Sequence, residues 1–132
     1  MDGIETLRRA AGQGGVLAKT SVGWRYRFGE GVDRGYVEAV KWFRKAAEQG
    51  LAKAQFNLAE MYRKGEGVFS NDSENAAEAV KWYRKAAEQE LADAQYLLGA
   101  MYYNGEGVRK NDAEAAKCFR KAAEQGYVKA QS

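Results

Sequence analysis

The sequence predicts an all-α protein of about seven helices, arranged as stacked helix pairs. Three observations lead to this class. Proline is absent from the 132 residues, whereas alanine, glutamate, lysine and arginine, which favour helices, are abundant. Similar segments recur every 36 to 40 residues. Apolar residues within each segment follow helical spacing, and because one pair cannot bury such a stripe alone, neighbouring pairs must stack.

The most regular segment of the repeat ends the second helix of each pair, which we call helix B. Its copies read LRRAAGQG, FRKAAEQG, YRKAAEQE and FRKAAEQG. The first helix, helix A, precedes it and ends in the motif GEGV. The sequence therefore predicts a single repeat domain over residues 1–132. Its expected parts are a half repeat with helix B alone at 1–14, full repeats at 15–50, 51–90 and 91–126, and the start of a further helix A at 127–132.

Helix A of the second repeat has the clearest apolar stripe, formed by Ala54, Leu58, Met61 and Tyr62. The first repeat is a weaker version of the same helix. Arg25 occupies the position of Met61 there, and glycines such as Gly23 each weaken a helix by up to about 1 kcal/mol.

The motif GEGV occurs three times and predicts a structural turn. Its first glycine falls where helix A must stop, and glycine adopts the left-handed conformation there without a Cβ penalty. Its second glycine lets the chain reverse. A phosphate-binding loop would need a preceding strand and a GxGxxG or Gly-Lys-Ser/Thr pattern, which this motif does not provide. The glycines expected in these turns are Gly29, Gly31, Gly65, Gly67, Gly105 and Gly107.

The second repeat departs from the pattern in two places. It carries four extra residues within FSNDSENAAEA, which correspond to about one helical turn. Asn71 and Glu74 have capping-box spacing, as do Asn111 and Glu114 in the next repeat. We therefore expect helix B of the second repeat to start one turn early rather than to follow a bulged loop. Glu90 replaces the glycine after this helix, so its end requires another cap.

Residues for catalysis and metal binding are scarce. The chain has no histidine and one cysteine, Cys118, which excludes an internal disulfide, a Ser–His or Cys–His pair and a His- or Cys-based zinc site. Cys118 occupies the position of Trp42 and Trp82, so we expect a packed thiol, with a redox role as the alternative. The acids of successive GEGV turns lie about a helix-pair width apart, too far for paired acid–base chemistry. We expect no catalytic residue, metal or cofactor.

Targeting signals are equally scarce in the sequence. No apolar run approaches the ~18–20 residues of a membrane span, and residues 1–15 do not contain the apolar core of a signal peptide. We therefore expect a cytoplasmic protein with no membrane partner. A periplasmic location stays open if Met1 is not the natural start.

The repeat residues resemble a known family. The pattern A-x-x-x-L-[GA]-x-x-Y-x-x-G-x-G-V, then A-x-x-W-[YF]-x-K-A-A-x-x-G, is similar to that of Sel-1-like repeats, a branch of the tetratricopeptide-like solenoids. The resemblance covers nearly the whole chain and implies a right-handed α/α superhelix, often bacterial, that serves as a scaffold or adaptor. Members with paired cysteines are linked to β-lactam binding, but this chain does not contain such pairs, and a β-lactamase-type hydrolase is only an alternative. The matching residues of the third repeat are Ala94, Leu98, Gly99, Tyr102, Gly105, Gly107, Val108, Ala115, Phe119, Lys121, Ala122, Ala123 and Gly126.

The face of helix A opposite the apolar stripe is the predicted partner-binding site. Residues of the stripe stay similar between repeats, whereas those of this face differ and are free to serve binding. The resemblance places the face in the concave groove of the solenoid. It holds large aromatic side chains and arginine, which are typical interface anchors, although some of them could instead pack between repeats. The predicted residues, which we call the helix-A face, are Thr20, Trp24, Arg27, Phe28, Phe56, Glu60, Arg63, Tyr96, Ala100 and Tyr103.

Helix B offers a rival site, because a pair of cations recurs in register on it and could form a basic stripe for nucleic acid. Acids are interleaved with these cations: Glu38 lies three residues before Lys41, and Glu48 four residues after Arg44. This arrangement, together with a net charge of only +3, predicts weak binding to nucleic acid. We therefore predict a non-catalytic module that binds another protein or a peptide. Its role could be that of an adaptor, an inhibitor or immunity-type binder, or a signalling regulator, and its oligomeric state is left open.

Overall fold

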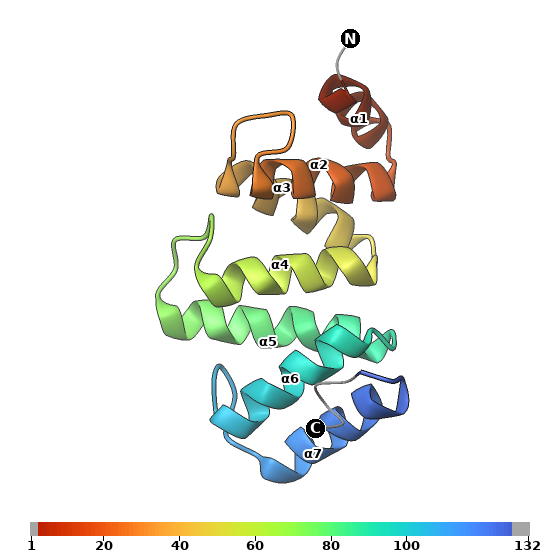
Figure 1. Cartoon of the computed structure of the whole chain (residues 1–132). Helices are drawn as coiled ribbons and strands as arrows, with labels where there is room; N and C mark the ends of the chain where they lie inside the picture. The colour runs from red at the N-terminus through yellow and green to blue at the C-terminus, as the bar shows by residue number, and fades with distance from the viewer. Residues whose placement is uncertain (1–2, 128–132) are drawn as a thin grey trace.

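The computed structural model describes residues 3–127, and over that range it contains seven α-helices and no strand (Figure 1). This confirms the all-α solenoid predicted from the sequence. The predicted start of a further helix A falls mainly on 128–132, outside the described residues. The helices are α1 (Gly3–Gly12), α2 (Val16–Phe28), α3 (Tyr36–Glu48), α4 (Ala52–Lys64), α5 (Asp72–Glu88), α6 (Ala92–Asn104) and α7 (Asp112–Glu124).

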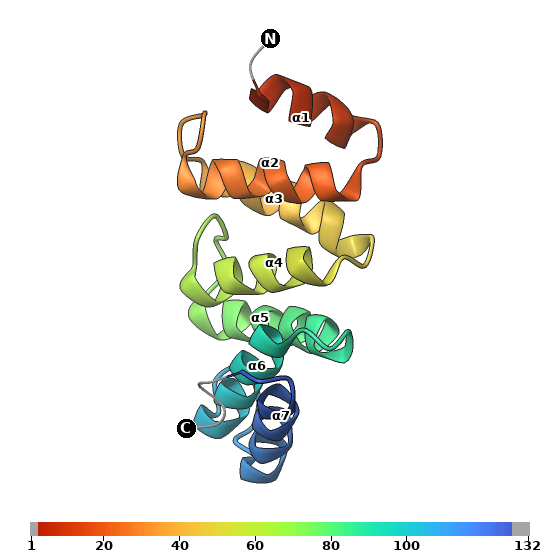
Figure 2. The same ribbon diagram turned by 45° about the vertical axis from the view of Figure 1, so that its right-hand side comes forward.

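The helices stack in one column, from α1 at one end to α7 at the other (Figures 1 and 2). Helices α2, α4 and α6 are of type A, and α1, α3, α5 and α7 are of type B. Each helix packs mainly against the helices before and after it in the chain. A residue on one repeat is therefore positioned by its own helix pair and by the adjacent pairs, as in other solenoids.

The core is built from large side chains set against very small ones. Phe43 and Tyr83 on type-B helices and Leu58 on α4 are fully buried. Gly23 on α2 lies so close to Phe43 that a Cβ atom added to it would be 2.8 Å from the ring. The sequence alone suggested only a weakened helix at Gly23, whereas the structure shows that this glycine makes room for Phe43.

Glycines end the type-A helices in the left-handed conformation, with φ of 70° at Gly29, 71° at Gly65 and 68° at Gly105. The end of α5 differs from our expectation, because no other cap replaces the missing glycine. Glu90 itself adopts the left-handed conformation, with φ of 66°. The backbone N–H of Leu91 then donates to the carbonyl oxygen of Ala86 at 3.3 Å, the bond that closes such helix ends.

The second glycine of the GEGV turn has a role that the sequence did not reveal. A Cβ atom on Gly67 would run into the carbonyl oxygen of Tyr36, at the start of α3. Gly107 lies in the same way against the carbonyl oxygen of Ala76 on α5. Each of these turns therefore packs closely against helix B of the preceding repeat, and glycine is required for the approach as well as for the backbone conformation.

The early start of helix B in the second repeat is confirmed. Helix α5 has 17 residues, whereas α3 and α7 have 13. The Asn71 side chain accepts a hydrogen bond from the Glu74 backbone N–H at 2.8 Å, and Asn111 accepts one from Glu114 at 3.0 Å. The four extra residues thus add one capped turn to the helix.

Buried glutamines connect the repeats through hydrogen bonds that the sequence did not predict. The Gln55 amide on α4 donates to the carbonyl oxygen of Ala47 at 3.2 Å and accepts from Gln89 at 2.9 Å. In the third repeat Gln95 occupies the equivalent position and accepts from Gln125 at 2.7 Å. The glutamine of helix A therefore ties the preceding helix B to the helix B of its own repeat.

Candidate functional site

Exposed aromatic residues of the helix-A face lie on α2 and α6. The side chains of Trp24 and Phe28 are 44% and 50% exposed, and their ring centroids are 4.5 Å apart. On α6, Tyr103 is 56% exposed, with the Lys110 ammonium 4.6 Å from its ring centroid. These three rings present apolar surface to the solvent, as the sequence analysis expected for a binding face.

Two other aromatic residues of the face pack partly inside the solenoid. Phe56 is half-buried against Tyr83, with 5.8 Å between ring centroids. Tyr96 is half-buried against Phe119 and Tyr127, at 5.4 and 5.1 Å. These contacts join a type-A helix to its own type-B helix or to the segment after it. The packing interpretation therefore applies to Phe56 and Tyr96, and binding by the exposed rings stays a prediction.

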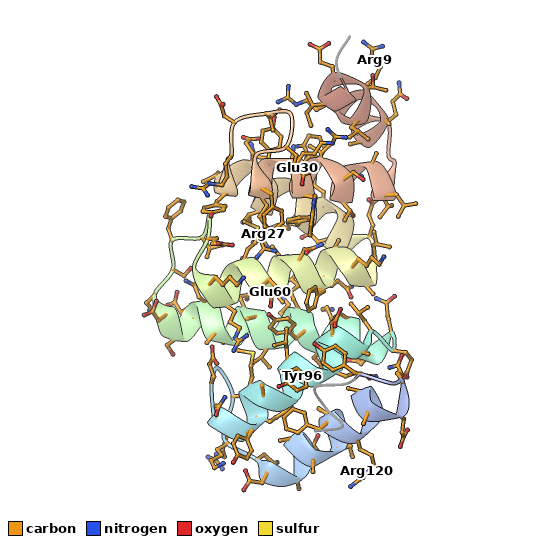
Figure 3. All side chains as sticks on the ribbon, in the orientation of Figure 1. Arg9, Arg27, Glu30, Glu60, Tyr96 and Arg120 are labelled. Atoms are coloured by element: carbon orange, nitrogen blue, oxygen red, sulfur yellow. The ribbon has the colours of Figure 1, made fainter. Side chains whose placement is uncertain are left out.

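Glu60 occupies the centre of the face on α4, pointing toward α5 (Figure 3). It accepts a hydrogen bond from the Tyr83 hydroxyl and forms an ion pair with Lys64 at 3.7 Å. Burial, together with this hydrogen bond, raises the pKa of Tyr83. Ala100 takes the equivalent position on α6 and is half-buried, as is Thr20 on α2, whose hydroxyl donates to the Val16 carbonyl at 3.1 Å.

The two arginines of the face join successive repeats, and our expectation for Arg27 needs correction. Arg27 is only 5% exposed and lies between α2 and α4 (Figure 3), where its guanidinium pairs with Glu66 of the next GEGV turn at 3.3 Å. Arg63 pairs in the same way with Glu106 at 3.6 Å but is more exposed. An arginine recurs at this position of helix A, and a glutamate recurs in the GEGV turn of the next repeat. This recurrence was a usable sequence signal for the two pairs.

A hollow of about 500 Å³ opens at the N-terminal end of the helix-A face. It lies between α1, α2 and α4, next to the first GEGV turn. It includes Thr20 and Trp24 from the predicted face, together with residues that the sequence analysis did not assign to binding. The lining residues of this N-terminal hollow are Leu7, Thr20, Ser21, Trp24, Arg25, Glu30, Lys53 and Asn57.

Two cations of helix B serve packing between repeats. The Arg44 guanidinium donates to the Tyr62 hydroxyl on the next type-A helix, and Arg84 donates to Tyr102 at 2.7 Å. The pairs that we expected four residues apart on helix B, such as Arg44 with Glu48, are not among the ion pairs of residues 3–127. The pairs three residues apart do form, for example Lys41 with Glu38 at 3.5 Å. Arg44 and Arg84 of the rival stripe are therefore occupied.

No chemical centre is evident in the described part of the chain. Cys118 on α7 is buried, and burial raises the pKa of its thiol, which disfavours the reactive thiolate. Residues 3–127 contain no group of three or more His, Cys, Asp or Glu side chains that could hold a metal ion. Over the same range no helix has the length and apolar character to cross a membrane.

Stacked helix pairs, linked by repeated side-chain bonds and exposing one face of the type-A helices, define an α/α repeat solenoid. The particular family is shown by a family model, described as Sel1 repeat, that matches residues 16–51, 52–91 and 92–127. The chain belongs to the Sel1 repeat family. Each matched segment begins one residue after the repeat boundary that we drew from the sequence.

Solved structures support the same assignment. The chain is 44% identical to c5321 of uropathogenic *Escherichia coli*, described as a protective antigen with an SLR fold, at a TM-score of 0.90; the match covers 96% of this chain and 26% of that one. It is 46% identical to a Sel1 repeat protein from *Oxalobacter formigenes*, at a TM-score of 0.81, covering 88% and 45%. *Helicobacter pylori* cysteine rich protein B shares the fold, with 23% identity, a TM-score of 0.73 and coverage of 98% and 95%.

The chain thus spans about a quarter of the *E. coli* protein and less than half of the *Oxalobacter* protein. A search of the curated proteins gave no significant match. Sel1 repeats are generally protein-interaction modules, and members of the family are typically non-enzymatic scaffolds.

Proposed function

We propose that this protein is a non-catalytic interaction module that binds a segment of another protein on its helix-A face. The observation that carries the proposal is the partial exposure of Trp24 and Phe28, whose rings contact each other at a tilt of 54° beside the N-terminal hollow. Covering the exposed part of each ring would contribute on the order of 1 kcal/mol, about half the value of burying a whole apolar side chain. Aromatic side chains of this kind are common hot spots of protein interfaces.

The binding surface that we propose is narrower than the face predicted from sequence. Trp24, Phe28 and Tyr103 offer exposed rings, while Phe56 and Tyr96 offer only the smaller part of each ring that packing leaves free. Arg27 is buried beneath this surface, where its ion pair with Glu66 links the first repeat to the second. Within this function the module acts as an adaptor or as an inhibitor of the immunity type, and the identity of the partner decides between these roles.

The test is capture of partners from a lysate of the source organism on the immobilised chain, followed by mass spectrometry. A protein retained by the wild type should be lost with Trp24→Ala. The matched control is Phe69→Ala, because Phe69 is 88% exposed but lies in the α4–α5 connection, away from the helix-A face. Equal retention by the wild type and both variants would contradict the proposed surface.

Binding of nucleic acid through helix B is the alternative to this function. It requires free cations, yet Arg44 and Arg84 contact tyrosines of the next repeat. A titration with duplex DNA at several salt concentrations separates the two functions, because phosphate binding weakens steeply as salt rises. Tight, salt-dependent binding that survives Trp24→Ala would favour the alternative.

A further inference from the structure

The cations of the type-A helices fall into two groups. Within residues 3–127, four of them have side-chain partners: Arg27 and Arg63 pair with turn glutamates, Lys64 pairs with Glu60, and Lys19 donates to Gln49 at 2.8 Å. The two that have neither an ion pair nor a side-chain hydrogen bond in this range are Arg25 and Lys53. Both line the N-terminal hollow, although they come from different repeats. Among the described residues, the two type-A cations without a side-chain partner therefore lie in one place.

A buried amide faces the same hollow. Asn57 lies one turn after Lys53 on α4 and is only 8% exposed, yet its side chain has no hydrogen-bond partner among the described residues. Other buried amides on the type-A helices are engaged; Gln55, for example, bonds to Ala47 and Gln89. Among the described residues the fully enclosed side-chain polar atoms without a partner are Asn75 Oδ1 and Trp82 Nε1, so the Asn57 amide is still open to the hollow. It can therefore bond to a group that enters the hollow.

We propose that the N-terminal hollow binds a carboxylate side chain from an acidic segment of the partner protein. Arg25 and Lys53 supply charged donors, and the Asn57 amide supplies a neutral one. The exposed ring of Trp24 covers the apolar stem of the bound side chain or of its neighbour in the segment. This inference rests on the proposed function and specifies the chemistry of the partner at one end of the helix-A face.

Glu30 limits what the hollow accepts. Its counterparts Glu66 and Glu106 each pair with an arginine on the type-A helix of the preceding repeat. The described helix before the first repeat is α1, a type-B helix, so Glu30 has no equivalent arginine there. Glu30 therefore adds one negative charge to a hollow with two cations. This balance suits one carboxylate of a peptide and disfavours a chain of phosphates, which needs a run of free cations.

The experiment is a selection of displayed short random peptides on the immobilised full chain, followed by affinity measurement with synthetic copies of the enriched peptides. We expect enriched peptides with aspartate or glutamate beside an apolar residue. Lys53→Gln and Arg25→Gln should each weaken the binding of such a peptide about tenfold, the scale of one charge-assisted contact. Lys64→Gln is the matched control, because Lys64 lies on the same helix as Lys53 but pairs with Glu60; it should leave the affinity unchanged. Circular dichroism confirms that each variant is folded.

Glu30→Gln provides a test in the opposite direction. Removing the like charge should tighten the binding of the acidic peptide, an outcome that general loss of structure cannot produce. Peptides that depend on Trp24 but contain no acid would overturn this inference and leave the proposed function standing. No enrichment, equal weakening by Lys53→Gln and Lys64→Gln, or tighter binding of single-stranded DNA than of the acidic peptide would also overturn it.

Discussion

The first repeat and the second repeat share one backbone plan but use their type-A helices differently. On α4, Met61 is fully buried, Gln55 bridges two type-B helices, and Phe56 packs on Tyr83. On α2, the corresponding positions hold Arg25, Lys19 and Thr20, and the large rings of Trp24 and Phe28 lie in solvent. The second repeat thus packs its aromatic residue at this face into the framework, whereas the first repeat exposes its two rings.

Under the proposed function, this difference reserves one repeat of the solenoid for binding. Stability in such arrays is roughly a sum over repeats and their interfaces, so the central repeats can hold the fold while a peripheral one carries less packing. Exposed aromatic rings and unpaired cations reduce the stability of the first repeat, and they are the groups that an interface uses.

The largest expected effect comes from exchanging the residues that occupy one equivalent position of the two repeats, Met61 and Arg25. Met61→Arg places a charge in a fully buried position without an acid partner, and it should lower the free energy of unfolding by about 3–5 kcal/mol. The reciprocal change Arg25→Met should alter it by less than about 1 kcal/mol, because that position borders the open hollow. Urea denaturation measures both values, and similar losses from the two changes would show that the repeats do not differ in this way.

A smaller effect is expected from the glutamine that connects the helices. Gln55→Leu removes the donor to the Ala47 carbonyl and the acceptor for Gln89, which should cost about 1–3 kcal/mol. Lys19→Gln, at the equivalent position of the first repeat, should change the stability by no more than about 0.5 kcal/mol. Thermal melting of both variants checks the contrast. It fails if Gln55→Leu melts at the wild-type temperature.

The smallest effect concerns the end of α5. Glu90 is held in the left-handed conformation, so Glu90→Gly should raise the free energy of unfolding by about 1 kcal/mol. Gly50→Ala, at the equivalent end of α3, should lower it by a similar amount; its φ is 94° and the space around it is open, so only the backbone conformation is altered. Chemical denaturation of the two variants should show opposite signs. A stabilising Gly50→Ala would contradict this assignment.

Much of the fold followed from local sequence signals. The helix pairs, the cap at Asn71 and the extra turn of α5 could be predicted because helical periodicity and capping are encoded within a few residues. The conformation of Glu90 could not, because nothing local favours a left-handed glutamate. Glu90 instead shares the left-handed conformation of the glycines at the equivalent position of the neighbouring repeats, Gly50 and Gly126.

The candidate site was only partly predictable, since exposure depends on contacts between repeats. Sequence periodicity placed Trp24 and Arg27 on the same face of a helix, but it could not show that one ring lies in solvent and that the guanidinium is buried against Glu66. The N-terminal hollow joins Arg25 to Lys53 and Asn57 of the next repeat. Such a grouping follows from how the repeats stack, which periodicity within one repeat does not specify.

The most direct test of this division between framework and binding surface compares two tryptophans by urea denaturation. Trp24 is 44% exposed on α2, and Trp82 is 5% exposed on α5. Trp82→Ala should lower the free energy of unfolding by about 3–5 kcal/mol, the cost of truncating a buried aromatic residue. Trp24→Ala should lower it by only about 1–2 kcal/mol, because Trp24 loses its contact with Phe28 and a burial that is only partial. A loss at Trp24 as large as that at Trp82 would contradict the account, because it would show that Trp24 is part of the framework rather than a surface kept for a partner.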